Sequence, residues 1–297
     1  MLDQICDLLE QQLGQLSDDA NAAAAEVASG GGDERAQAAA GTAAAAAHSR
    51  SIEALLYCCR SVARTLDQRR SALPGRVFAL LDQVPTSLDD RLQYTSLLLI
   101  GRYAPFLNRN PELLSSSFTV VLEALSYASL AAPPDGDDLV ALANYRTAVT
   151  NREAATHAFK HVCQQCAPHI ATNVGPLLEL CDTVSALPLV TTSAAISTGA
   201  SYAGGVLAVD DALEFYAGVA AVIRRMPTCA NSGDADADGV MIEAAQRVCA
   251  PFIAQLQDEQ RLANEPETVI DIVKVLTAFF ENAHYVHDDA ALAALAD

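Results

Sequence analysis

The chain has 297 residues, of which 51% are hydrophobic, and it contains no tryptophan. Its 37 acidic residues against 18 basic ones give a formal net charge of −19, which argues against nucleic acid or anionic membranes as direct partners and favours basic ones. The eight cysteines follow no basic, apolar leader, so we expect a reducing compartment in which they act as small hydrophobic residues.

The first 49 residues are predicted to contain one helix and one disordered segment. Residues 1–16 place leucine and isoleucine at helical spacing and read as a partial repeat helix. Residues 17–49 are rich in Ala, Gly and Asp and have almost nothing large to bury. We therefore predict a disordered low-complexity insertion, with helix in the alanine tract as the alternative.

Residues 50–286 carry apolar stripes at spacings of three and four, which predict a series of helix pairs. The helix expected over 91–105 is apolar on nearly every side, so it must be covered on more than one side. Asn110, as N-cap, and Pro111 are expected to start its partner. Such a pair needs neighbours on both sides, which is the arrangement of a helical repeat.

The remaining helices are predicted at 51–66, 74–84, 152–166, 170–187, 210–226, 240–257 and 268–280, with Pro251 expected to kink or split its helix. Insertions are predicted near 131–150, 188–209 and 228–239, the first with a short helix around 139–145 as an alternative, and an acidic, Ala-rich tail over 287–297. The uncharged run 183–209 is rich in small residues and is interpreted as a loop rather than a membrane span.

The predicted fold is therefore all-α, an α-α superhelix of the HEAT or armadillo type without a sheet. Leu99, Phe118 and Phe159 are predicted core residues of adjacent repeats. The chain shows no phosphate loop, no nucleophile elbow and no convincingly placed pair of carboxylates, so we predict no enzyme activity and no cofactor.

One cluster of potential metal ligands comprises His157, His161, Cys163, Cys166 and His169. Zinc binding and redox chemistry are the alternatives that its CxxC element offers. A helix turns about 100° per residue, so His161 and Cys163 lie on opposite faces. Because both cysteines also fall on the apolar stripe, a structural role is predicted.

A second acidic candidate, Asp234-Ala-Asp236-Ala-Asp238-Gly239, matches the first half of a calcium-binding EF-hand loop. The closing glutamate is missing because position 245 is alanine, so an acidic solvated loop is predicted, with weak calcium binding as the alternative.

Two further groups were considered as sites. Cys58 and Cys59 are predicted to be structural. Arg64, Arg69, Arg70 and Arg76 form a basic cluster, interpreted as a solvated loop or a contact for an acidic partner. We therefore predict no metal site.

Several of these segments resemble nuclear transport receptors of the importin-β superfamily. Ser51–Ala63 is similar to their "EA-L-F" helix, and Arg91–Ser96 with Asn110-Pro111 resembles the "R-Y-T-S … N-P" pair of the transportin-SR (transportin-3) and importin-13 branch. Ala154–His169 resembles that branch's "I-C-x-x-C-x-x-H" helix, and Asp211–Pro227 its next helix, ending in "R-x-P". The resemblance covers about Ile52 to Phe280 in collinear order.

The resemblance implies a HEAT-repeat receptor that shuttles between cytoplasm and nucleus and imports protein cargo, basic or Ser/Arg-rich, under control of the GTPase Ran, with nucleoporins as further partners. The chain matches the middle of such a solenoid, without the Ran-binding repeats or the arginine-rich cargo helix. We therefore expect a fragment, an incomplete gene product or a shortened relative, and no partner-contact residue is carried over. A generic HEAT scaffold or adaptor is the alternative function.

Overall fold

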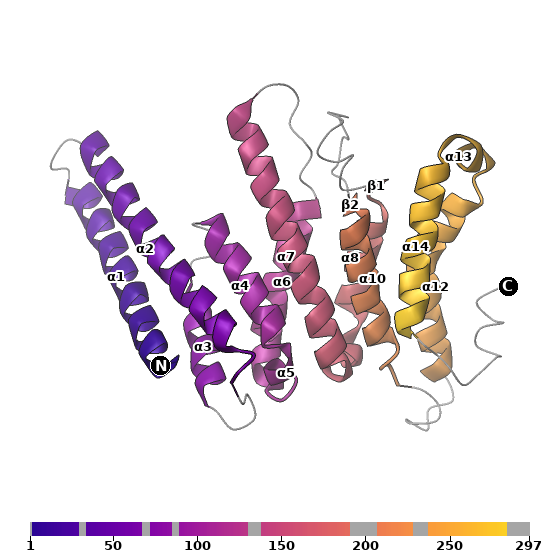
Figure 1. Ribbon diagram of the computed structural model, residues 1–297, viewed down its shortest axis with the longest axis horizontal. Coiled ribbons are helices and arrows are strands. Elements are labelled where there is room, and N and C mark those ends of the chain that lie inside the picture. Colours follow the sequence, from indigo (N-terminus) through magenta and orange to yellow (C-terminus); the bar gives the residue numbers. More distant parts are fainter. Residues whose placement is uncertain are drawn as a thin grey trace. The chain divides into compact units, whose positions relative to one another are not determined.

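The computed structural model describes residues 2–29, 34–66, 72–84, 89–129, 138–190, 207–227 and 237–283 (Figure 1). The chain divides into two compact units, Met1–Phe106 and Leu107–Asp297, and each is described by itself. Both are built from packed helices, so the predicted all-α helical-repeat fold is confirmed.

The first unit contains α1 (Leu2–Ser29), α2 (Glu34–Val62), α3 (Leu73–Leu81) and α4 (Asp90–Arg102), and α5 (Ala104–Leu107) lies where it ends. Helix α1 packs on α2 and α3, and α2 packs on α4. The Tyr103 hydroxyl donates to the Cys59 carbonyl at 3.0 Å inside this core. Leu99 of α4 is fully buried, as predicted.

The prediction of disorder over residues 17–49 is wrong for most of that range. Helix α1 continues to Ser29 and α2 starts at Glu34, while residues 30–33 lie outside the described part of the chain. Alanine is the strongest helix former and loses no side-chain entropy in a helix, so the tract extends the two helices on either side of it. The lack of large apolar side chains did not prevent this, because α1 and α2 pack on each other.

The second unit is built mainly from long helices: α6 (Leu114–Ser129), α7 (Leu139–Ile170), α8 (Gly175–Ser185), α10 (Val209–Ile223), α12 (Ala237–Leu256) and α14 (Pro266–Ala283). Shorter elements are η1 (Pro111–Leu113), η2 (Ala171–Asn173), α13 (Glu259–Asn264), β1 (Leu189–Val190) and β2 (Leu207–Ala208). Helices α7, α10 and α14 lie side by side in one layer, and α8 packs on α12 in the second (Figure 1).

Several predicted boundaries differ from the structure. Helix α7 begins at Leu139 rather than Arg152, because Asp138 accepts hydrogen bonds from the amides of Val140 and Ala141 and starts the helix early. The segment 138–150 is therefore helix and not part of an insertion. Asn110 makes no side-chain cap bond, and a 3-10 turn precedes α6.

Helix α12 is not split at Pro251, which lies inside it. It begins at Ala237, so residues 237–239 are helix and not loop.

Among the described residues, the predicted absence of a sheet fails at β1 and β2, which pair in parallel with Leu189 opposite Leu207. The insertions predicted near 188–209 and 228–239 otherwise fall on residues 191–206 and 228–236, outside the described residues, as does the tail over 287–297.

A chain of aromatic rings runs through the core of the second unit. Phe159 of α7 is fully buried and stacks on Phe215 of α10, with ring centroids 4.8 Å apart. Tyr216 contacts Phe215 at 5.1 Å and Phe252 of α12 at 5.0 Å, both edge to face. Phe118 of α6 stacks on Phe159 at 5.9 Å and is half-buried, so it packs at the edge of this core.

The α7–α10 interface also contains a buried ion pair. Arg152 Nε lies 2.8 Å from an Asp211 carboxylate oxygen, and the two side chains are 3% and 6% exposed. Burial raises the pKa of Asp211 to about 6, although the Arg152 charge opposes that rise. Desolvation therefore outweighs the attraction between the two charges, and the pair is expected to fix the register of the helices more than to stabilise them.

Removing one partner of this pair should destabilise the protein more than removing both. Asp211→Leu leaves the Arg152 charge buried without its counter-ion and should lower the free energy of unfolding by about 3–5 kcal/mol. The double variant Arg152→Met/Asp211→Leu should recover most or all of that loss in chemical denaturation. An equal loss of unfolding free energy in the single and the double variant would contradict the inference that desolvation outweighs the attraction between the two charges.

Gly218 of α10 allows α7 to approach closely. A Cβ built there would meet Phe159 Cε1 at 3.0 Å and the Lys160 Cα at 3.2 Å, whereas a Cβ at Gly239 of α12 meets nothing within 4 Å. Gly218→Ala should therefore destabilise the protein by about 1–3 kcal/mol. Gly239→Ala, the matched control, should stabilise it by roughly 0.4–1 kcal/mol. If Gly218→Ala also raised the melting temperature, the neighbours of Gly218 would have moved to make room for the added methyl group.

Candidate functional site

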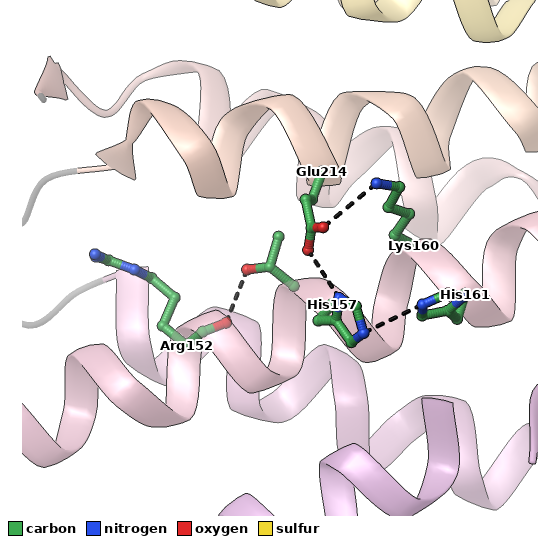
Figure 2. A network of polar contacts seen from close by, with 6 residues as sticks. Arg152, His157, Lys160, His161 and Glu214 are labelled. Atoms are coloured by element: carbon green, nitrogen blue, oxygen red, sulfur yellow. Dashed lines mark hydrogen bonds and ion pairs between the residues drawn. The ribbon is translucent and has the colours of Figure 1, made fainter. Parts of the chain in front are cut away.

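A row of polar side chains crosses from α7 to α10 (Figure 2), and these side chains are partly exposed to solvent. Lys160 Nζ lies 3.3 Å from Glu214 Oε1, and His157 Nδ1 lies 3.3 Å from Glu214 Oε2. His157 Nε2 lies 3.2 Å from His161 Nε2. We call Lys160, Glu214, His157 and His161 the α7–α10 polar row. Thr156, which directly precedes His157 in α7, donates to the Arg152 carbonyl at 2.8 Å.

Helix geometry places these groups together. His157, Lys160 and His161 are three and four residues apart, so they lie on one face of α7. Glu214 lies between Asp211 and Gly218 on α10, and those two residues face α7 in the buried ion pair and the close contact. The close approach of the helices at Gly218 thus brings the Glu214 carboxylate within reach of α7.

The charge of Glu214 is favoured by its partners. The hydrogen bond from His157 is the largest influence and lowers the pKa of Glu214, burial opposes it, and Lys160 lowers the pKa further. The carboxylate is therefore ionised at neutral pH. Because the shift is downward, its stabilising effect is present above the unfolded-state pKa and is lost as the pH falls through the lower folded-state value.

A solvent-open groove of about 750 Å³ lies next to this row, over α10 and between α7 and α14. Its lining combines apolar residues with charged ones: Lys160, Gln164, Leu213, Glu214, Ala217, Val269, Ile270, Val273, Lys274, Thr277, Ala278, Glu281 and Asn282. Ile270 is 55% exposed and Val273 is 48% exposed. A groove whose lining is largely apolar, with a few charged side chains, suits a protein segment better than a small polar substrate.

The predicted His/Cys cluster divides between two faces of α7. Cys163 and Cys166 are buried, and burial raises the pKa of both thiols. His157 is 51% exposed, and His169 Nε2 lies 2.9 Å from the Asn108 carbonyl, away from the other two histidines. The opposite placement of histidine and cysteine follows the helical geometry expected from the sequence.

The other sequence candidates are also separated. Asp234 and Asp236 lie outside the described residues, and Asp238 is in the first turn of α12. Within the described ranges, no group of three or more His, Cys, Asp or Glu side chains could hold a metal ion. Cys59 is buried in the core, while Cys58 is exposed.

The arginine cluster differs from its prediction in composition. Arg76 forms ion pairs with Asp7 and Glu10 of α1, at 2.6 and 2.8 Å. The pKa of Arg102 is lowered by burial and by the nearby charges of Arg64 and Arg60, so Arg64 lies in a basic group with Arg102 instead. Arg69 and Arg70 lie outside the described residues.

The fold and surfaces define the class of an all-α helical-repeat protein. No helix among the described residues is both long and apolar enough to cross a membrane. When the sequence is compared with known protein families, no family matches it.

The pKa of Glu214 offers a direct test of the polar row. In His157→Ala the carboxylate loses the hydrogen bond that lowers its pKa most, so its titration midpoint, followed by ¹³C NMR, should move up toward 4.5. Lys160→Met should give a smaller upward shift. An unchanged midpoint in His157→Ala would mean that the imidazole does not hold the carboxylate in solution.

Proposed function

We propose that this chain is the central part of a HEAT solenoid of a nuclear transport receptor, which carries protein cargo into the nucleus in a Ran-dependent cycle. The support is that each receptor-like segment lies on a helix. Ser51–Ala63 covers the end of α2, Arg91–Ser96 lies in α4, Ala154–His169 in α7, and Asp211–Pro227 covers α10 and the turn after it. A set of motifs that falls on four repeat helices in chain order is the observation on which this proposal depends.

The acidic charge is concentrated in the second unit. From Leu107 to Asp297 the sequence has 24 acidic and 9 basic residues, and the first 106 residues have 13 and 9. A basic or Ser/Arg-rich cargo would be attracted mainly to the second unit, because that unit carries the larger excess of negative charge.

Exposed carboxylates on α8 and α12 are the groups best placed for such a cargo. Glu179 and Asp182 of α8 and Glu243 of α12 face solvent, in the layer opposite α7, α10 and α14. Arg247 of α12 pairs with Asp182 and links the two helices. This α8–α12 face combines a rigid helical support with excess negative charge, which favours recognition of extended basic segments by charge complementarity.

The other partners of this proposal are Ran, contacted through repeats outside this chain, and nucleoporins. The receptor would shuttle between cytoplasm and nucleus. A generic HEAT scaffold shares the fold and the acidic surface, and Ran-dependent release of cargo is the property that separates the two functions.

Binding of a fluorescent Ser/Arg-repeat peptide tests the cargo surface. The whole chain should bind it with an affinity that weakens as salt rises. The double charge reversal Glu179→Lys/Glu243→Lys on the α8–α12 face should weaken binding several-fold. Glu153→Lys, the same exposed change on α7, should have little effect. Equal weakening by Glu153→Lys would mean that the peptide responds to the net charge of the protein and not to the α8–α12 face.

Ran dependence tests the transport role itself. A receptor that joins this segment to Ran-binding repeats should release the peptide when Ran-GTP is added and not when Ran-GDP is added. Peptide binding that ignores the nucleotide state of Ran would favour the scaffold function.

A further inference from the structure

The Nε2 atoms of His157 and His161 lie next to each other on the exposed side of α7. Their Nε2 atoms are 3.2 Å apart and their ring centroids 4.5 Å apart. Two imidazole nitrogens that bind one tetrahedral Zn²⁺ at about 2.0–2.1 Å must lie roughly 3.3–3.4 Å from each other. The observed separation is close to that value, so a small adjustment of the two side chains would let both nitrogens contact a single ion.

Glu214 orients the first of these rings. It accepts a hydrogen bond from His157 Nδ1, so this nitrogen carries the proton and the Nε2 lone pair is directed away from the carboxylate. A carboxylate that holds the remote nitrogen of a histidine is the usual outer partner of a metal-binding imidazole, and it increases the basicity of the nitrogen that binds the metal.

The hydrogen bonds to Glu214 and between the two rings also define which ring nitrogens carry protons when no metal is bound. With both rings neutral, His157 Nε2 is an acceptor and His161 Nε2–H donates to it. To bind an ion, His161 must carry its proton on Nδ1 instead, which leaves the number of protons on the pair unchanged. The Glu214 charge also offsets the repulsion between a bound cation and Lys160, whose Nζ lies 3.3 Å from the other Glu214 oxygen.

We infer that His157 and His161 form a surface site for a divalent transition-metal ion, Zn²⁺ or Cu²⁺. Water completes the coordination, and Glu214 acts as a positioning residue that holds the His157 ring. Imidazole nitrogens favour these ions over Mg²⁺ and Ca²⁺, which prefer oxygen ligands. The site does not involve Cys163 or Cys166, which are buried, and it is independent of the transport role.

Isothermal titration calorimetry of the whole chain with Zn²⁺ alone, and separately with Cu²⁺ alone, tests this site. The wild-type protein should bind one equivalent, and His157→Ala and His161→Ala should each weaken binding at least tenfold, because each removes one of two protein ligands. Glu214→Gln should weaken it about 10- to 100-fold, the usual effect of losing an outer partner. Mg²⁺ should show no binding in the same experiment.

His169→Ala is the matched control, because this histidine lies on the same helix and its Nε2 faces the Asn108 carbonyl. It should bind metal like the wild type. Cys58→Ser should also leave binding unchanged, which separates the histidine site from the exposed thiol. Circular dichroism shows whether each variant remains folded. Wild-type affinity in both His157→Ala and His161→Ala, or binding lost in Cys58→Ser, would overturn the proposal.

Discussion

The close contact between α7 and α10 is the constraint on which the second unit depends. Asp211, Glu214 and Gly218 follow each other at helical spacing along the side of α10 that meets α7. Gly218 leaves room for Phe159, and that contact sets the distance between the helices. The buried ion pair fixes their register, and the Glu214 carboxylate then reaches His157 and Lys160. A larger side chain at position 218 would thus disturb both the aromatic core and the polar row.

The two faces of this interface depend on different forces. The ring chain from Phe159 to Phe252 joins three helices by apolar burial and favourable ring geometry, which contribute most of the stabilisation. Surface ion pairs such as Lys160–Glu214 contribute little to stability, since solvent screens them and both side chains lose freedom. Their effect is to orient side chains at the surface, so the polar row is a matter of geometry rather than of folding energy.

Apolar periodicity predicted the helices with large side chains, including α4, α10 and the part of α7 that carries Phe159. It failed for residues 17–49, because alanine favours helix formation without producing a periodic pattern of large apolar side chains. The polar row could not be predicted, because Glu214 is separated from His157 by 57 residues and only packing brings them together. The spacing of His157 and His161 is visible in the sequence, but it does not show that their Nε2 atoms meet. Asn110 shows that a residue suited to capping does not always cap.

The short strands β1 and β2 have a consequence for how the chain can change over evolution. Because Leu189 pairs with Leu207, the chain leaves α8 and returns to α10 at neighbouring points, and both strands contact α10. The entropy needed to close the connection grows only slowly with its length, by about 0.6 kcal/mol for each doubling. Residues can therefore be gained or lost between the strands with little effect on the helices, which makes this position a permissive one for insertions and for grafting a foreign sequence.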